Sequence, residues 1–209
     1  MIKTLVTFSI IFCIIYFIHG CKSKIVGPDN VTANVQPLSV GSEWYYKDTG
    51  YNPDGTKKDY EGYYTLTIKM DTIINRNKWA LIISVPECDD CGFGEYLSNR
   101  SDGLWWGFPL EADSLTWLRL PYPSKIGVEA INPYNKWWVE NVDTILQVPA
   151  GTFKCYHYKT KEISRNQHFV HDYFYSPGVG LVRLNWYSQA NDGSIYVYLQ
   201  RDLINYTIK

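Results

Sequence analysis

The thiols of Cys88, Cys91 and Cys155 are the side chains of this sequence that could do redox or metal chemistry. Two residues separate Cys88 from Cys91, a spacing that suits a disulfide across a turn, a redox pair or half of a zinc site. A redox pair normally opens a helix, whose N-terminus lowers the thiol pKa. Pro86-Glu87 before the pair and Gly92-Phe93-Gly94 after it instead predict a loop. A structural zinc site needs two further ligands, and the sequence has no second Cys-x-x-Cys.

We therefore favour a disulfide between Cys88 and Cys91, with Cys155 unpaired and buried, provided that the compartment is oxidising. Free thiols are the main alternative. A bridge from Cys155 to Cys88 or to Cys91 is also compatible with the sequence.

Three histidines have the composition of a metal site but not its spacing. His168 and His171 are three residues apart, and such residues point to opposite faces of a strand. His157, on another strand, could join one of them in a two-histidine site. We expect ordinary sheet histidines and no bound metal.

Carboxylates offer no catalytic pair. Two carboxyl groups at a fixed separation can share acid and base roles, but no spacing selects a pair among Glu111, Asp113, Glu140 and Asp143. The sequence also lacks a Gly-x-Ser-x-Gly elbow and a phosphate-binding glycine loop. We expect no catalytic residue and no cofactor, and hence a protein that is not an enzyme.

Aromatic side chains are the strongest candidates for a binding site. Adjacent tryptophans in a strand point to opposite faces, so one member of each adjacent pair faces outward or into a groove. Such a ring can stack on a sugar or line an apolar cavity, whereas the structural alternative is that it fills the core. The candidate ligand-lining residues are Trp44, Trp105, Trp106, Trp137, Trp138 and Tyr173.

The N-terminus has the pattern of a bacterial lipoprotein signal. Lys3 supplies the charged start, and the apolar run from Leu5 to Ile18 supplies the core. Ile18-His19-Gly20-Cys21 resembles a lipobox, which places the signal peptide at residues 1–20 and makes Cys21 the lipidated residue. The alternative is an uncleaved transmembrane helix, but the run of about 14 apolar residues is shorter than the about 20 that a span needs.

Lipidation would fix the address of the protein. In lipoproteins of this kind, an aspartate directly after the cysteine is the signal for retention in the inner membrane. Lys22 stands there instead, so the resemblance implies the outer membrane. No acidic run follows Cys21, which favours a periplasm-facing domain over a surface-exposed one. Residues 21–36 are rich in turn formers and predict a flexible tether. Residues 37–209 then form a single antiparallel β domain.

Composition and turn spacing predict the fold class. Lys plus Arg number 20 and Asp plus Glu 21, a balance that gives no basic footprint for nucleic acid. Eight Trp and 18 Tyr, with short β-like runs between turn signals, predict an all-β sheet, half-barrel or open barrel of about ten strands. The expected strands are 43–48, 62–75, 78–85, 95–99, 103–107, 115–120, 136–147, 151–161, 169–175, 180–188 and 194–206. In one of them, alternation places Leu66, Ile68 and Met70 on a single face.

Three segments in order carry a family resemblance. Pro37 to Tyr46 resembles a "Pro-Leu-x-x-Gly-x-x-Trp-x-Tyr" opening, Val148 to Phe153 is a "Val-Pro-Ala-Gly-Thr-Phe" element, and Tyr175 to Arg183 resembles a "Tyr-x-Pro-Gly-Val-Gly-x-Val-Lys" hairpin. Together they resemble a family of Bacteroidetes-type lipoproteins. The resemblance implies a half-barrel similar to periplasmic lipoprotein carriers, and it brings no settled activity and no catalytic residues.

The sequence therefore favours a membrane-anchored, non-enzymatic binding or envelope-structural module. One alternative is a lipid or lipoprotein carrier with an apolar concave sheet face. Another is a carbohydrate-binding module that uses exposed tryptophans. The expected partners are the membrane, through Cys21, and a lipid or glycan ligand.

Overall fold

The structure is a computed structural model that describes residues 25–26, 34–86, 93–110, 115–163 and 169–209. Cys21, Cys88, Cys91, Glu111, Asp113 and His168 lie outside these residues, and so does any pairing between Cys88 and Cys91. Within the described part of the chain, no helix has the length and apolar character needed to cross a membrane.

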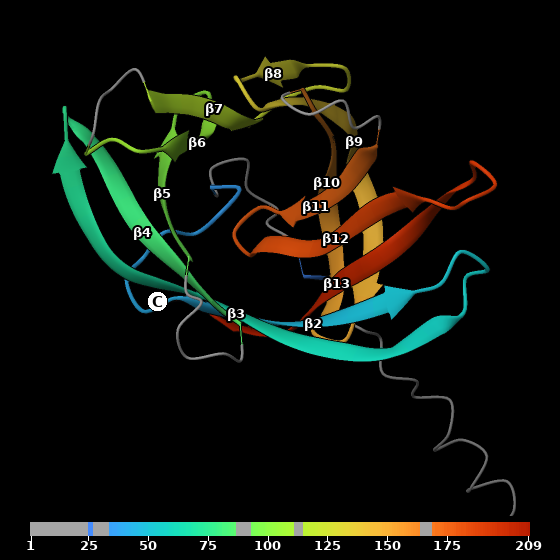
Figure 1. The fold of residues 1–209 in the computed structure, drawn as a ribbon. Coiled ribbons are helices and arrows are strands. Elements are labelled where there is room, and N and C mark those ends of the chain that lie inside the picture. The colour runs from blue at the N-terminus through green and yellow to red at the C-terminus, as the bar shows by residue number, and fades with distance from the viewer. Residues whose placement is uncertain (1–24, 27–33, 87–92, 111–114, 164–168) are drawn as a thin grey trace, which may run out of the picture.

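Twelve antiparallel strands follow one another in a single curved sheet. In sheet order they are β7 (Thr116–Pro121), β6 (Gly103–Gly107), β5 (Phe93–Arg100), β4 (Asn77–Pro86), β3 (Lys57–Ile74), β2 (Glu43–Tyr51), β13 (Ile195–Thr207), β12 (Gly180–Gln189), β11 (Val170–Ser176), β10 (Gly151–Glu162), β9 (Asn135–Val148) and β8 (Glu129–Ile131). A short strand, β1 (Ile25–Val26), pairs in parallel with the start of β10. The sheet curls until its end strands β7 and β8 contact each other, at the top of Figure 1. This nearly closed barrel confirms the all-β open barrel that the sequence predicted.

Tight turns set the order of the strands. Asn75 and Arg76 have φ of 50° and 65°, the positive angles that a two-residue hairpin turn between β3 and β4 requires. Between β11 and β12, the amide of Val179 donates to the carbonyl of Ser176 at 2.9 Å, and Gly178 has a φ of 80°. Both loops lie in gaps between the strands that the sequence predicted.

The concave face of the sheet holds the core. Its fully buried side chains include Trp44, Tyr46, Phe153, Tyr158 and Leu203, which come from β2, β10 and β13. Burying each large side chain contributes about 1.5 to 3 kcal/mol. The core is therefore aromatic as much as aliphatic, as the composition indicated.

The chain ahead of β2 packs into this core. Val35 and Gln36, which were predicted to belong to the tether, are 0% and 3% exposed. The side-chain amide of Asn99 donates to the Gln36 carbonyl at 2.8 Å, and the amide of Gly178 donates to the Asn34 carbonyl at 2.8 Å. The folded domain therefore begins before residue 37. The prediction of a tether up to residue 36 missed this because a turn-rich composition gives no sign of long-range contacts.

A β-bulge changes one predicted face. Ile68 is buried at 1% exposure, but Met70 is 45% exposed. The register of β3 on β4 steps from Ile68 to Met70 and leaves Lys69 unpaired, so the alternation of side chains shifts by one residue. The prediction that Met70 shares the inner face is therefore wrong.

Candidate ligand-binding site

Two cavities open on the concave side of the sheet. The first, which we call the aliphatic cavity, has a volume of about 310 Å³. The second, the polar cavity, has a volume of about 290 Å³. They share the lining residues Glu95, Arg119, Tyr173 and Trp186, so they adjoin. Because these residues come from β5, β7, β11 and β12, which lie far apart in the sheet order, both cavities lie between opposite walls of the barrel.

Aliphatic side chains line much of the first cavity, but a buried cation lies among them. Arg201 is 9% exposed and donates from Nε and Nη2 to the two carboxylate oxygens of Asp48, both at 2.7 Å. Its guanidinium also lies 3.7 Å from the ring centre of Tyr64 and 5.4 Å from that of Trp186. The aliphatic lining residues are Leu66, Ile82, Leu97, Leu104, Leu181 and Leu184.

Burial works against the charge of Arg201, but the hydrogen bonds and the charge of Asp48 outweigh it and hold its pKa above the ordinary value. Arg201 therefore stays charged in the wall of the cavity.

A second ion pair lies where the two cavities meet. Arg119 Nη1 donates to Glu95 Oε2 at 3.0 Å, and the guanidinium lies 5.5 Å from the ring centre of Trp137. Burial opposes the charge of Arg119. The attraction of Glu95, and then of the phenols of Tyr175 and Tyr173, outweighs burial and raises its pKa. The junction of the cavities is therefore polar and charged.

Among the described residues, no aliphatic side chain lines the polar cavity. Four aromatic residues, Trp106, Trp137, Tyr173 and Trp186, lie among seven polar ones: Glu95, Arg119, Asn132, Asn135, Thr160, Glu162 and His171. The ring centres of Trp137 and Tyr173 are 4.8 Å apart. Such a lining presents flat apolar faces beside hydrogen-bonding groups.

Three donors of this lining have no hydrogen-bond partner among the described residues. They are Nε1 of Trp106, Nε1 of Trp137 and the hydroxyl of Thr160. Trp137 and Thr160 are each only 3% exposed. Leaving a buried donor unsatisfied costs about 1 to 3 kcal/mol. The aliphatic cavity has a fourth such group, the side-chain nitrogen of Gln36.

His171 and Tyr175, two titratable rings of the lumen, stay neutral at pH 7. Burial lowers the pKa of His171 below its ordinary value of 6.5, against the opposite pull of Glu162 and then Asp172. Its Nδ1 accepts a hydrogen bond from the backbone amide of Tyr187 at 3.2 Å, which leaves Nε2 as the protonated nitrogen. Burial also raises the pKa of Tyr175 to about 12. These rings therefore act as neutral hydrogen-bonding groups.

The six aromatic residues predicted to line a ligand site divide into two groups. Trp106, Trp137 and Tyr173 line the polar cavity, and Tyr173 also lines the aliphatic one. Trp44 is fully buried and donates from its indole nitrogen to the carbonyl of Val179, so it serves the core.

The two remaining tryptophans belong to other surfaces. The indole of Trp105 donates to Asp102 at 2.8 Å, and Arg100 lies 4.1 Å from its ring centre. The indole of Trp138 donates to Glu140 at 3.1 Å. Neither residue lines a described cavity, so each tryptophan pair contributes one ring to the lumen, as strand alternation predicted.

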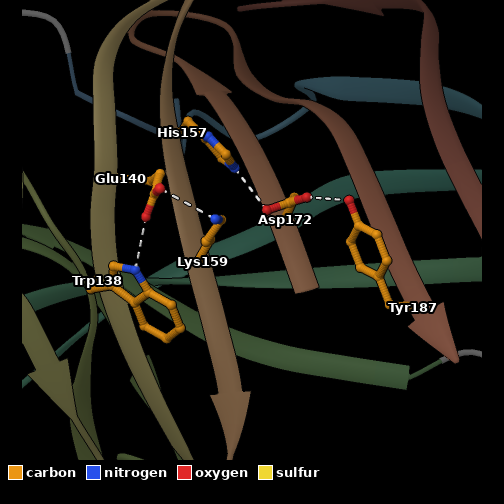
Figure 2. A network of polar contacts seen from close by, with 6 residues as sticks. All are labelled: Trp138, Glu140, His157, Lys159, Asp172 and Tyr187. Atoms are coloured by element: carbon orange, nitrogen blue, oxygen red, sulfur yellow. Dashed lines mark hydrogen bonds and ion pairs between the residues drawn. The ribbon is translucent and has the colours of Figure 1, made fainter. Parts of the chain in front are cut away.

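His157 and Glu140, two of the residues considered for metal or acid–base chemistry, lie in a polar network across β9 to β12, shown in Figure 2. His157 Nε2 lies 2.8 Å from Asp172 Oδ1, and the phenol of Tyr187 donates to Asp172 Oδ2 at 2.5 Å. Lys159 and Trp138 both contact Glu140. Each link joins neighbouring strands or residues of one strand, so the network ties the convex face of the sheet together.

This network does not form a metal site. No group of three or more His, Cys, Asp or Glu side chains suited to a metal occurs in the described ranges. His171 lies in the polar cavity and His157 in the network, so the two do not share a site. Asp143 forms an ion pair with Lys154 at 2.7 Å, and Glu140 forms another with Lys159 at 3.2 Å. These two carboxylates therefore have different partners.

Sequence reasoning missed the charged residues of the lumen. Arg201 had a readable signal, because it lies two residues from both Leu199 and Leu203 and so shares their face in regular alternation. Arg119 had none. The register of β7 on β6 steps from Leu118 to Leu120, and the bulge at Arg119 turns it into the lumen.

Comparisons with known proteins support the fold alone. No family model and no curated protein matches the sequence. A protein classed as exported, with a YmcC-like fold, from Bacteroides fragilis is similar in structure, with a TM-score of 0.51 and 12% identity over 84% of this chain and 100% of that chain. A protein classed as a lipoprotein from Parabacteroides distasonis has a TM-score of 0.48 and 14% identity over 84% of this chain and 99% of that chain. The chain thus has a fold similar to the YmcC-like fold of the Bacteroides fragilis protein.

Proposed function

We propose that this protein is a membrane-anchored lipoprotein of the bacterial cell envelope that binds a small ligand in the lumen of its barrel and catalyses no reaction. The observation that carries the proposal is the set of buried, unpartnered donors that line two adjoining cavities. Ligand sites in proteins usually occupy about 300 to 1,000 Å³. Cavities of about 310 and 290 Å³ therefore suit a small ligand.

The anchor rests on the N-terminal sequence. Cys21 follows an apolar run and a small residue, as a lipidated cysteine does, and Lys22 favours the outer membrane with the domain facing the periplasm. The exported protein of Bacteroides fragilis with a similar fold supports a place in the cell envelope. Acyl chains on Cys21 would hold the domain at a leaflet, because each buried methylene contributes about 0.8 kcal/mol.

The lumen supports binding and gives no support to catalysis. The carboxylates of Asp48, behind the lumen wall, and of Glu95, in its lining, are each engaged by an arginine. His171 accepts a backbone hydrogen bond through Nδ1. The lining groups that lack a hydrogen-bond partner among the described residues are donors, and together with the aromatic faces they can recognise and orient a molecule without transferring a proton.

A lipid or lipoprotein carrier is the second candidate. Six aliphatic side chains line the aliphatic cavity, and an acyl chain could lie against them. Such a chain offers no acceptor to Gln36, and it would lie beside the Arg201–Asp48 pair. We therefore rank this function below the binding of a polar ligand.

Two measurements test the proposal. Cys21→Ser should abolish fatty-acid labelling and release the domain from membranes, while the matched variant Cys13→Ser should stay labelled and membrane-bound. Fatty-acid labelling of the Cys21→Ser protein would overturn the anchor.

Native mass spectrometry of protein purified from its own envelope should show a mass above that of the lipidated chain, and the excess mass should disappear on denaturation. A native mass equal to the denatured mass would oppose a bound ligand.

A further inference from the structure

The lining of the polar cavity indicates the chemical class of its ligand. This inference rests on the proposed function. Its three unpartnered groups, on Trp106, Trp137 and Thr160, are hydrogen-bond donors. A ligand that satisfies them must present several acceptor oxygens within one small molecule. A hydrocarbon chain presents none, and an ammonium group presents only further donors.

The charge of the lining argues against an anion. Arg119 lies in this cavity, but Glu95 already binds it at 3.0 Å. Glu162 is a second carboxylate of the lining, and His171 is held neutral by burial. The formal charge around the cavity is therefore not positive, and an anionic group would gain no free cation here.

The aromatic rings supply the other half of the recognition. Trp137 and Tyr173 pack with ring centres 4.8 Å apart, and Trp106 and Trp186 complete the aromatic part of the lining. Each ring offers a flat apolar face. In the part of the chain that the structure describes, no aliphatic side chain accompanies them in the lining. A ligand that fits has an apolar face and a rim of oxygens.

We infer that the polar cavity binds a neutral saccharide. A sugar ring has C–H faces that pack on aromatic rings, and its hydroxyl and ring oxygens accept hydrogen bonds from indole N–H and threonine O–H groups. A volume of about 290 Å³ fits a short saccharide, of one or two rings, better than a long glycan that runs through the barrel. Trp137 and Thr160 recognise the oxygens, and Tyr173 packs on the ring.

The test uses the full-length protein extracted from membranes in a detergent without a sugar headgroup. Tryptophan fluorescence is titrated with glucose, galactose, mannose, N-acetylglucosamine and their disaccharides, and separately with laurate. At least one saccharide should give a saturable change. Trp137→Phe keeps an aromatic ring, though a smaller one, and removes the indole N–H, and Thr160→Val removes the hydroxyl at similar volume. Each variant should weaken the binding of that saccharide about fivefold, the factor expected for one hydrogen bond. Trp138→Phe is the matched control, because Trp138 bonds to Glu140 outside the cavity, and its affinity should equal that of the wild type.

The outcomes separate this inference from the proposed function. Saturable binding of laurate but of no saccharide overturns the saccharide assignment and leaves a ligand-binding lumen. Saccharide binding that Trp138→Phe weakens as much as Trp137→Phe places the sugar outside the cavity and also overturns the inference. Absence of binding in both titrations, together with a native mass equal to the denatured mass, overturns both proposals. Circular dichroism of each variant shows whether it has folded.

Discussion

Arg201 and Asp48 are register partners on β13 and β2, and they form a two-pronged ion pair with both N–O distances at 2.7 Å. Their side chains are 11% and 10% exposed. Removing two charges from water is costly, and the cost is recovered only while both partners are present. The pair therefore fixes how β2 meets β13 at the wall of the aliphatic cavity.

Asp48→Asn should lower the free energy of unfolding by about 3 kcal/mol, because it leaves the buried charge of Arg201 without a counterion. Asp71→Asn is the control. Asp71 pairs with Lys78 at 2.6 Å, but the two side chains are 38% and 66% exposed, so the change should cost at most about 1 kcal/mol. Urea unfolding of both variants measures the difference. Equal losses would mean that burial adds nothing to the pair.

The network around Asp172 should make stability depend on acid pH. Burial favours the protonated acid, but the hydrogen bonds from His157 and Tyr187 outweigh burial and hold the pKa of Asp172 below its ordinary value of 3.8. Protonation therefore favours the unfolded chain. The stabilisation is complete above the unfolded-state pKa of about 3.9 and is lost as the pH falls through the lower folded-state pKa.

Asp172→Asn should accordingly cost about 1.5 to 3 kcal/mol at pH 7, as expected for hydrogen bonds to a charged group. The difference from wild type should shrink as the pH falls below about 4. Tyr187→Phe removes one donor and should give a smaller effect of the same sign. Urea unfolding from pH 7 to pH 3 provides the measurement. A difference that is constant across this range would contradict the lowered pKa.

Gly180 should tolerate substitution by alanine less well than Gly127, although both glycines have positive φ. It has a φ of 102°, and a Cβ there would lie 2.5 Å from Oε1 of Gln36, which accepts from the amide of Leu181. Gly127 has a φ of 83° with open space around it. Gly127→Ala should cost about 1 kcal/mol for the backbone alone. Gly180→Ala should cost more, about 3 kcal/mol, because it also displaces a buried amide. Thermal unfolding compares the two variants, and equal losses would show that Gln36 moves freely.

Cys155 should be inert in the folded protein. It is fully buried and unpaired, and burial raises the pKa of its thiol to about 12 from 9.0. That change lowers the thiolate fraction at neutral pH about a thousandfold. Iodoacetamide followed by peptide mass spectrometry should label Cys155 only after unfolding in urea. Rapid labelling of Cys155 in native protein would contradict its place in the core.

Local rules predicted the elements of the fold but not the irregular positions within them. The turns at Asn75-Arg76 and Pro177-Gly178 were readable because Asn75 and Gly178 tolerate positive φ, while Pro177 fixes the negative φ of the position before Gly178. Bulges were not readable, since an extra residue in one strand depends on the partner strand. The bulge at Lys69 exposes Met70, and the short strand β8 (Glu129–Ile131) lacked a long enough alternation to be predicted.

The candidate site was predicted in its aromatic half only. Strand alternation indicated that one ring of Trp105-Trp106 and one of Trp137-Trp138 would face outward or into a groove, and Trp106 and Trp137 line the polar cavity. Trp186, which lines both cavities, was not predicted. Thr160 and Gln36 carry no local signal. Their role depends on walls contributed by strands far away in the sequence, which alternation within one strand does not specify.

The most direct test of the central claim is a crystal structure of the protein purified from its own membranes. We expect electron density beyond that of the chain between Trp137, Thr160 and Tyr173, within hydrogen-bond distance of Nε1 of Trp137 and Oγ1 of Thr160. Walls that close together and leave no space in the lumen, with both of these donors bonded to other groups of the protein, would contradict it.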